Sequence, residues 1–102
     1  MRERDFARQV ETMLDYYGWL WKHDETAQRP GGGFATAFRG RRGFPDYIAV
    51  RGTRVLVAEI KSDKGKPSSD QLVWLAAFEN TGRVESYLWR PADLSTIAEI
   101  LK

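Results

Sequence analysis

Residues 55–58 constrain the fold most, because four apolar residues follow one another there directly after a turn. A strand that is apolar on both faces belongs in the middle of a sheet that is covered on both sides. Gly52 lies within the turn, residues 51–54, and residues 46–50 before it are expected to form the partner strand of a β-hairpin. The second strand of the hairpin is expected to cover residues 55–61.

The turn also predicts which residues of the hairpin lie opposite each other. In an antiparallel hairpin that turns at residues 52–53, the numbers of paired residues sum to about 105, which places Asp46 opposite Glu59. Glu59 and Lys61 are two residues apart on one strand, so their side chains leave the same face. Two carboxylates and an ammonium group at one end of a sheet are costly for stability unless something binds there.

This group of side chains has the composition of a divalent-metal site. Mg²⁺ prefers oxygen ligands, which Asp46, Glu59 and the backbone carbonyl of Ile60 could supply. Lys61 would lie close enough to contact a metal-bound water or a scissile phosphate, and such a set supports phosphodiester hydrolysis. The alternative is a surface ion-pair cluster, which is common in proteins and adds little stability.

The remaining pattern predicts helices and strands around the hairpin. Ser68 and Gln71 match a capping box that begins a helix ending near residue 81. Glu11 lies beside the apolar stripe of the first helix, where periodicity alone favours an exposed side chain. His23 is the only histidine of the chain, and a structural or exposed role is expected for it. The other expected elements are a helix over 3–17, a strand over 19–23, a strand over 85–90 and a helix over 92–101.

Residues 24–44 lack a periodic pattern, apart from a brief strand expected within 34–38. A loop this long is more often functional than idle, and we expect a flexible loop that orders on DNA. Between residues 29 and 54 there are six arginines and one acid, Asp46. Arginine suits bidentate phosphate contacts, although a solvated loop would also carry such charges. The candidate DNA-contacting residues are Arg39, Arg41, Arg42, Arg51, Arg54, Lys64 and Lys66.

The composition is that of a soluble globular chain. Its 102 residues are expected to form one domain, with 42% hydrophobic and 29% charged residues and a net charge of only +2. No apolar run is long enough to span a membrane, and the charged N-terminus does not resemble a signal peptide. The chain has no cysteine, which excludes thiolate metal sites and fits a cytoplasmic protein. The cell that we expect to contain it is a bacterial or phage-infected one.

Two motifs carry a resemblance to a known family. Pro45-Asp46, followed by Glu59-Ile60-Lys61, resembles the signature of the PD-(D/E)XK nuclease superfamily. More narrowly, residues 43–46, 59–62, 64–65 and 68–71 resemble the virus-type replication-repair nuclease (VRR-NUC) domain, and the resemblance covers about residues 5–95. It implies an α/β fold with a restriction-endonuclease-like αβββαβ core, in which helices flank a mixed central β-sheet.

The resemblance also implies an activity, an endonuclease that uses Mg²⁺ or Mn²⁺ to cut structured DNA in replication or repair. Asp46 and Glu59 match the metal-binding acids of the family, Lys61 matches its catalytic lysine, and Glu11 matches a further metal-binding acid on the first helix. Gln71 matches a glutamine that faces the site, although the capping box explains it equally well. Free-standing members of the family resemble Holliday-junction resolvases, which work as homodimers.

Three other functions remain open at this point. A repair or restriction nuclease acting on flapped or linear DNA would use the same residues. A non-catalytic DNA-binding module on the same fold would keep the arginines without needing all of Asp46, Glu59 and Lys61. A structural or regulatory protein would carry the acids as paired surface charges and would show no salt-dependent affinity for DNA.

Overall fold

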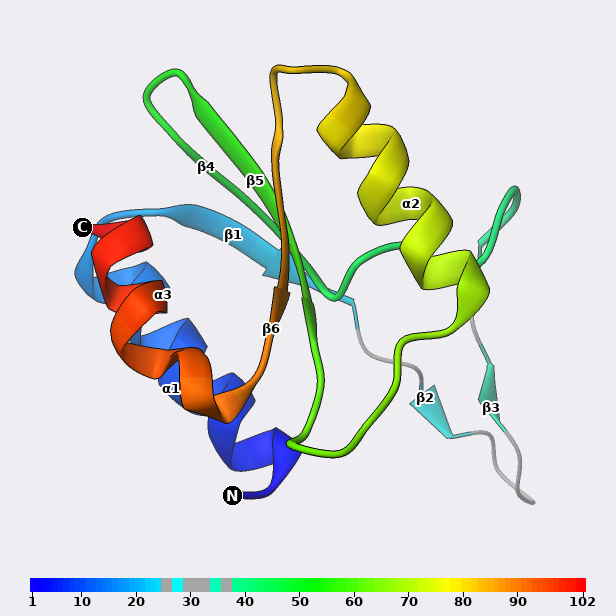
Figure 1. Cartoon of the computed structure of the whole chain (residues 1–102), viewed down its shortest axis with the longest axis horizontal. Coiled ribbons are helices and arrows are strands. Elements are labelled where there is room, and N and C mark those ends of the chain that lie inside the picture. Colours follow the sequence, from blue (N-terminus) through cyan, green and yellow to red (C-terminus); the bar gives the residue numbers. More distant parts are fainter. Residues whose placement is uncertain (25–26, 29–33, 36–37) are drawn as a thin grey trace.

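The structure is a computed structural model that describes residues 1–24, 27–28, 34–35 and 38–102. The described residues form a mixed four-stranded sheet with helices on both sides, as Figure 1 shows. The strands, in order across this sheet, are β1 (Leu20–His23), β4 (Tyr47–Arg51), β5 (Arg54–Ile60) and β6 (Glu85–Trp89). The helices are α1 (Glu3–Tyr16), α2 (Ser69–Asn80) and α3 (Leu94–Leu101), and a 3-10 turn (Pro91–Asp93) leads into α3.

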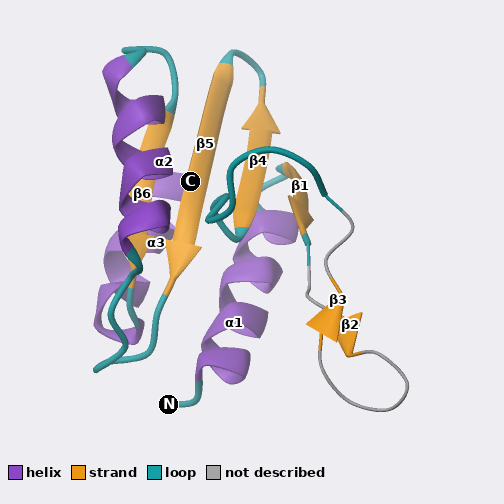
Figure 2. Ribbon diagram, turned by 90° about the vertical axis from the view of Figure 1, so that its right-hand side faces the viewer, coloured by secondary structure: helices purple, strands orange, loops and turns teal. Residues whose placement is uncertain are grey.

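Strand β5 lies inside the sheet, between β4 and β6, as its apolar sequence predicts. It pairs antiparallel with β4 and parallel with β6, and β1 pairs antiparallel with the outer edge of β4 (Figure 2). Residues 56–60 are all buried. The predicted α/β fold class, a mixed sheet flanked by helices, is confirmed.

The two faces of the sheet are covered differently. Helices α1 and α3 lie on one side of the sheet, and α2 lies on the other, over β5 and β6 (Figure 1). Along β5, Leu56, Ala58 and Ile60 join the core on the side of α1 and α3, so the alternating residues Val57 and Glu59 face α2. Glu59 is therefore a charged side chain at a buried position between the sheet and a helix.

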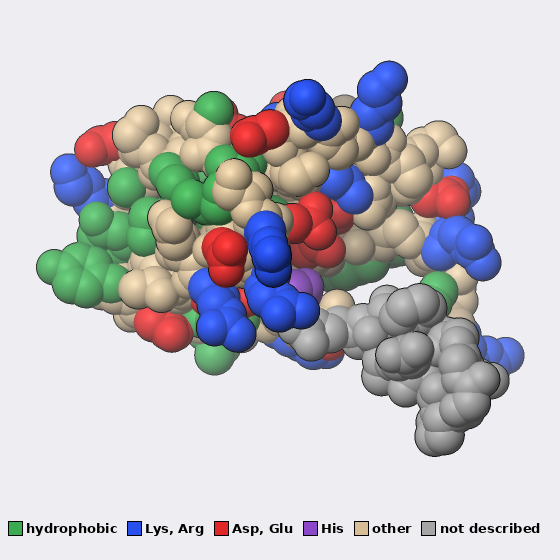
Figure 3. Space-filling model, turned by 90° about the horizontal axis from the view of Figure 1, so that it is seen from below, with side chains coloured by type: hydrophobic (Ala, Val, Ile, Leu, Met, Phe, Trp, Pro, Cys, Tyr) green, Lys and Arg blue, Asp and Glu red, His purple; other side chains and the backbone are tan. Residues whose placement is uncertain are grey.

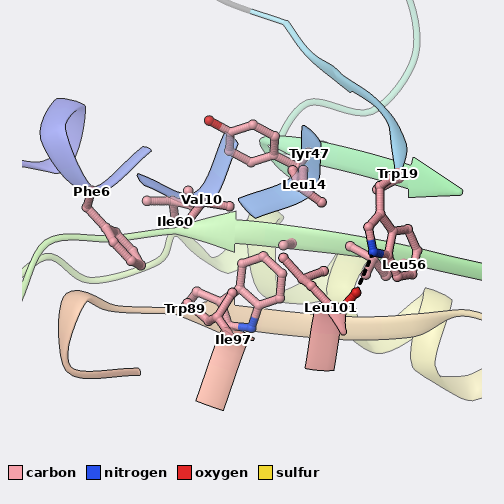
Figure 4. Packing of buried hydrophobic residues seen from close by; sticks show 12 residues of the cluster. Phe6, Val10, Leu14, Trp19, Tyr47, Leu56, Ile60, Trp89, Ile97 and Leu101 are labelled. Carbon is pink, nitrogen blue, oxygen red and sulfur yellow. Dashed lines mark hydrogen bonds between the residues drawn. The ribbon is translucent and has the colours of Figure 1, made fainter. Parts of the chain in front are cut away.

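The core on the α1 and α3 side holds the ends of the sheet in place. Phe6, Val10 and Leu14 of α1 meet Ile97 and Leu101 of α3 over the sheet (Figure 4). The indole N–H of the buried Trp19 donates a hydrogen bond to the carbonyl of Leu101 at 2.9 Å, which ties the end of α3 to the start of β1. Burial of this many large apolar side chains contributes most of the stability of such a fold.

The segment that leads into β4 is attached to α2. The indole N–H of Trp74 donates to the carbonyl of Arg42 at 2.9 Å, and the ring of Phe44 packs edge-on against Trp74. Gly43 has a φ of +92°, and a Cβ there would lie 2.7 Å from carbon atoms of Asp70. Only glycine permits this close approach without strain. The loop therefore enters β4 from a defined position beside the N-terminal end of α2.

Several predicted boundaries are shifted by one or two residues. The hairpin strands begin and end one residue from their expected limits, because Arg51 and Arg54 pair with each other and leave Gly52 and Thr53 as the turn. Gly52 has a φ of +60°, which suits a two-residue turn. The last helix begins as the 3-10 turn after Arg90 rather than at residue 92.

Within the segment expected to be a loop, the structure describes two short paired strands, β2 (Ala27–Gln28) and β3 (Phe34–Ala35). The predicted strand over 34–38 is confirmed for its first two residues. Residues 25–26, 29–33 and 36–37 of the predicted flexible loop lie outside the described residues. In the part of the chain that the structure describes, no helix is long and apolar enough to cross a membrane.

Candidate active site

Asp46 and Glu59 meet at one end of the sheet, as the hairpin register predicts. The last pair of β4 and β5 is Tyr47 with Ala58, and Asp46 and Glu59 are the next residues beyond it. A carboxylate oxygen of Asp46 accepts a hydrogen bond from the backbone N–H of Ile60 at 2.8 Å. The charge of Asp46 lies close enough to Glu59 to act on its carboxyl group. The structure thus brings two carboxylates together where β4 begins and β5 ends.

Glu59 is almost completely buried, with 1% of its surface exposed. Its Oε2 accepts a hydrogen bond from Nε2 of Gln71 at 2.7 Å and lies 3.4 Å from Nζ of Lys61. Burial, together with the nearby charge of Asp46, raises the pKa of Glu59 to about 7, and the ammonium group of Lys61 partly opposes this shift.

The second carboxylate oxygen of Glu59, Oε1, is buried and has no hydrogen-bond partner among the described residues. A buried oxygen of this kind is rare in proteins and indicates a missing partner such as a water or an ion. Mg²⁺ and Mn²⁺ bind oxygen ligands and often need only one or two carboxylates from a protein. Asp46 and Glu59 fit such an ion, and the carbonyl of Ile60 lies between Glu59 and Lys61 in the chain.

Gln71 has the two roles that the sequence left open, and it fills both at once. Its Oε1 accepts from the backbone N–H of Ser68 at 2.8 Å, and the hydroxyl of Ser68 accepts from the backbone N–H of Gln71 at 3.1 Å. This reciprocal pair is the predicted capping box. The remaining amide Nε2 is directed to Glu59, so the first turn of α2 also positions a carboxylate of the site.

Glu11 approaches from α1, on the opposite face of the sheet from Glu59. Its Oε2 accepts a very short hydrogen bond from the hydroxyl of Tyr47 and lies 3.5 Å from Nδ1 of His23. Glu11 is therefore half-buried rather than exposed, contrary to the expectation from periodicity. Among the described residues, no three histidine, cysteine, aspartate or glutamate side chains are close enough together to hold a metal ion. The structure thus does not join Glu11 to Asp46 and Glu59 in one cluster.

A cavity of about 570 Å³ nevertheless lies between α1 and this end of the sheet. Asp46 and Ile60 line it together with Glu11, His23 and Tyr47. Figure 3 views the molecule from this end and shows acidic, basic and histidine side chains next to one another. The volume is within the usual range for a small-molecule pocket, so part of a substrate can enter beside Asp46.

Five of the predicted DNA-contacting residues lie on segments next to the carboxylates. Arg39 and Arg42 are exposed, and Arg41 forms an ion pair with Asp70 at 2.9 Å. Lys64 and Lys66 are exposed on the loop between β5 and α2.

Arg90, which the sequence did not single out, shapes that loop. Its guanidinium donates hydrogen bonds to the carbonyls of Ser62 and Gly65, both at 2.7 Å. These bonds join residues more than twenty positions apart in the sequence, so no local pattern predicts them.

Arg51 and Arg54 are not brought to the site. The guanidinium of Arg51 donates to the carbonyls of Tyr17, Leu101 and Lys102. The guanidinium of Arg54 forms a two-point ion pair with Glu85 at 2.7 and 2.8 Å. Both arginines flank the hairpin turn, and Arg51 lies four positions along the strand from Tyr47, a distance of about 13 Å. Their positive charges are used within the fold, at the end of the sheet opposite Asp46.

Tyr47 and His23 are contacts of the site that sequence reasoning missed. They face each other across β1 and β4, with ring centroids 4.4 Å apart. Tyr47 directly follows Asp46, so strand alternation could have placed its side chain toward the first helix. The pairing of β1 with β4 has no comparable local signal, because a long segment separates the two strands.

Comparison with known proteins supports the assignment of the fold. A solved structure described as a VRR_NUC domain superimposes with a TM-score of 0.69, and the match covers 95% of this chain and 94% of that chain. This chain has the fold of a VRR_NUC domain. The two sequences are 19% identical, so the similarity concerns the fold alone. No family model and no curated protein matches the sequence.

With the VRR_NUC fold assigned, the predicted restriction-endonuclease-like architecture is confirmed. Pro45-Asp46 begins β4, Glu59 and Ile60 end β5, and Lys61 follows them, as the resemblance implies. The VRR_NUC fold therefore places the two motifs of the sequence at one end of one sheet.

Proposed function

We propose that this chain is a metal-dependent nuclease that hydrolyses phosphodiester bonds in DNA. The observation that carries the proposal is the buried Glu59, whose Oε1 has no partner among the described residues and which lies beside Asp46 and Lys61. A structural protein would gain nothing from a buried carboxylate that is left half-satisfied. The nuclease-domain fold of the chain supports the same class of chemistry.

Asp46 and Glu59 would hold Mg²⁺ or Mn²⁺, with the carbonyl of Ile60 and the side chain of Glu11 as further candidate ligands. The ion, when bound, lowers the pKa of a water and neutralises charge on a phosphate. Lys61 lies next to Glu59, and its ammonium group would orient the attacking water or stabilise the charge that develops on the phosphate. Gln71 would keep Glu59 in position through its 2.7 Å hydrogen bond.

The DNA would be held by basic residues that flank these carboxylates. Arg39 and Arg42 on one loop, and Lys64 and Lys66 on another, expose side chains that can contact phosphates. Arg41 adds a fifth contact if the phosphate competes with Asp70 for its guanidinium.

Our proposed substrate is branched DNA, such as a four-way junction, cut by a homodimer with two active sites. Leu20 and Val50, which pair across β1 and β4, are 78% and 37% exposed and offer apolar surface for a second copy of the chain. A repair or restriction nuclease acting on flapped or linear DNA is the alternative, since the same carboxylates would serve it.

One cleavage experiment tests the proposal. Labelled four-way junction, flap, linear duplex and single strand are incubated with the purified chain in Mg²⁺, Mn²⁺ or EDTA, and the cuts are mapped. We expect metal-dependent nicks that disappear in Asp46→Ala and Lys61→Ala, while both variants still bind DNA. Lys102→Ala, at the far end of α3, is the matched control and should cleave normally. Full activity in either site variant would refute the assignment.

The pattern of cuts separates the substrates. Paired, symmetric nicks in the junction support a dimeric resolvase. Cuts confined to the flap or the linear duplex support the alternative.

A further inference from the structure

Arg4 and Arg8 of α1 line the same cavity as Asp46 and Ile60. They are four residues apart, so both side chains lie on one face of the helix, about 6 Å apart along its axis. Neither arginine belongs to the arginine-rich segment around the hairpin. The structure therefore adds two cations to the carboxylate end of the sheet.

Both guanidinium groups are exposed and form no interaction with the other described residues. Within residues 1–24, 27–28, 34–35 and 38–102, neither the Arg4 nor the Arg8 guanidinium forms an ion pair or a hydrogen bond. Arg51, Arg54 and Arg90, by contrast, bind carbonyl or carboxylate oxygens of the fold. An arginine that the fold does not use is free to bind a ligand.

Three acids line this cavity, and two of them already have partners, whereas the third, Glu3, is exposed beside Arg4. Glu11 accepts the hydroxyl of Tyr47, and Asp46 accepts the backbone N–H of Ile60. Figure 3 shows Lys and Arg side chains beside acidic side chains and the histidine on this face. A polyanion that enters the cavity would therefore meet two free guanidinium groups before it reaches Asp46.

We propose that Arg4 and Arg8 form a second phosphate-binding surface, on the opposite side of the site from the residues of the 39–42 and 62–67 loops. The cut strand then passes from those loops across Asp46 and along the first two turns of α1. Arginine binds phosphate through two parallel hydrogen bonds, and two arginines one turn apart can contact neighbouring phosphates of one strand. This inference rests on the proposed nuclease function.

The test measures DNA affinity in EDTA, so that no strand is cut. A labelled four-way junction and a linear duplex of the same sequence are titrated with the chain at several salt concentrations, and binding is followed by fluorescence anisotropy. Each lost phosphate contact should lower the slope of log K against log salt by about 0.9. We expect about one such step for Arg4→Gln or Arg8→Gln and about two for the double variant, with roughly tenfold weaker binding per arginine.

Matched variants make the result specific. Arg83→Gln removes an exposed arginine after α2, at the other end of the sheet, and should leave the slope unchanged. Arg4→Lys with Arg8→Lys keeps both charges and should restore most of the slope. Far-ultraviolet circular dichroism and a thermal melt confirm that each variant is folded.

A double Arg4→Gln, Arg8→Gln variant with the unchanged affinity and slope would overturn this inference. The proposed function would then still stand if Asp46→Ala and Lys61→Ala abolish cleavage. If the unchanged chain neither binds nor cuts DNA, both proposals fall together.

Discussion

The buried residue Glu59 links the stability of the fold to the proposed function. Its carboxylate lies between the sheet and α2, where its ionised form is poorly solvated and is repelled by Asp46. Gln71 and Lys61 satisfy one of its oxygens and leave the other without a partner among the described residues. The metal-free chain therefore carries a cost at this residue that a bound cation would remove.

The first prediction concerns the pH dependence of stability. The pKa of Glu59 is about 7 in the folded chain, against 4.5 for the ordinary side chain. Between these values the folded state binds more protons than the unfolded state, so this residue lowers the free energy of unfolding as pH rises from about 4.5 to 7. Glu59→Gln removes the charge and should be more stable than the unchanged chain at pH 8, by roughly 1–3 kcal/mol.

Urea denaturation at pH 5 and pH 8 in EDTA checks this difference. The advantage of Glu59→Gln should shrink at pH 5, where Glu59 is protonated. An equal difference at both pH values would contradict the raised pKa of Glu59.

The second prediction separates the two roles of Gln71. Ser68→Ala removes one hydrogen bond of the capping box and should cost about 1 kcal/mol of unfolding free energy without slowing cleavage. Gln71→Ala removes the cap and the contact with Glu59, so its cleavage rate should also fall by roughly 10–100-fold. Urea denaturation and single-turnover cleavage provide the two measurements. Equal cleavage rates in the two variants would show that Gln71 only caps the helix and that its contact with Glu59 does not affect cleavage.

Among the elements, the contact between the arginine-rich loop and α2 sets the position of Asp46. Gly43 lies against Asp70, Phe44 packs on Trp74, and two residues later the chain reaches Asp46. A displacement of this loop would move the start of β4. The loop thus connects the arginines proposed to contact DNA to the carboxylate pair through a short stretch of backbone.

The third prediction tests this contact with two glycines. Gly43→Ala should destabilise the chain by roughly 2–4 kcal/mol, because a Cβ at φ +92° is strained and would overlap Asp70. Gly40 has a similar φ of +96° with nothing within 4 Å of a Cβ, so Gly40→Ala should cost only the strain, about 1–2 kcal/mol. Urea denaturation compares the two variants. Equal decreases in the free energy of unfolding would show that the close approach of Gly43 to Asp70 does not contribute to the cost of Gly43→Ala.

The elements that could be predicted are those whose sequence pattern lies within a few neighbouring residues. The register of β4 and β5 depends on a two-residue turn, so Asp46 and Glu59 could be placed opposite each other from sequence. The capping box at Ser68 is equally local. The pairing of His23 with Tyr47 joins distant segments, and nothing near either residue indicates it.

For Arg51 and Arg54, closeness in the sequence predicted a closeness in space that the structure does not have. Arg51 and Arg54 are close to Asp46 in sequence, which suggested a shared surface. A strand, however, carries the chain about 3.3 Å per residue in one direction, so the turn and the site lie at opposite ends of the hairpin. Arg4 and Arg8, distant in sequence, reach the site because α1 crosses the same end of the sheet.

For the whole molecule, Arg51 connects three separate parts of the chain. It bonds to the carbonyl of Tyr17 after α1 and to the carbonyls of Leu101 and Lys102 at the end of α3, while its own backbone belongs to β4. Its guanidinium also lies 4.8 Å from the ring centroid of Trp19. The side chain therefore holds both core helices to the sheet.

The fourth prediction contrasts Arg51 with Arg42. Arg51→Gln should destabilise the chain by roughly 2–3 kcal/mol, because charged hydrogen bonds to several carbonyls are lost, and should leave the salt dependence of DNA binding unchanged. Arg42→Gln should change the stability little and should lower the slope of log K for DNA binding against log salt by about 0.9. Urea denaturation and anisotropy titrations measure both quantities. A lower salt slope in Arg51→Gln would show that Arg51 contacts a DNA phosphate.

The bond between Trp74 and the loop has one practical consequence. The indole N–H of Trp74 donates to the carbonyls of Arg41 and Arg42, and the ring of Phe44 lies 5.1 Å from its own. Indole fluorescence changes with hydrogen bonding and solvent contact, and the indoles of Trp19 and Trp89 are buried in the core. Once the partly buried Trp21 is replaced by phenylalanine, Trp74 is a built-in optical probe of the loop, and its emission would follow the proposed encounter with DNA in real time without any attached dye.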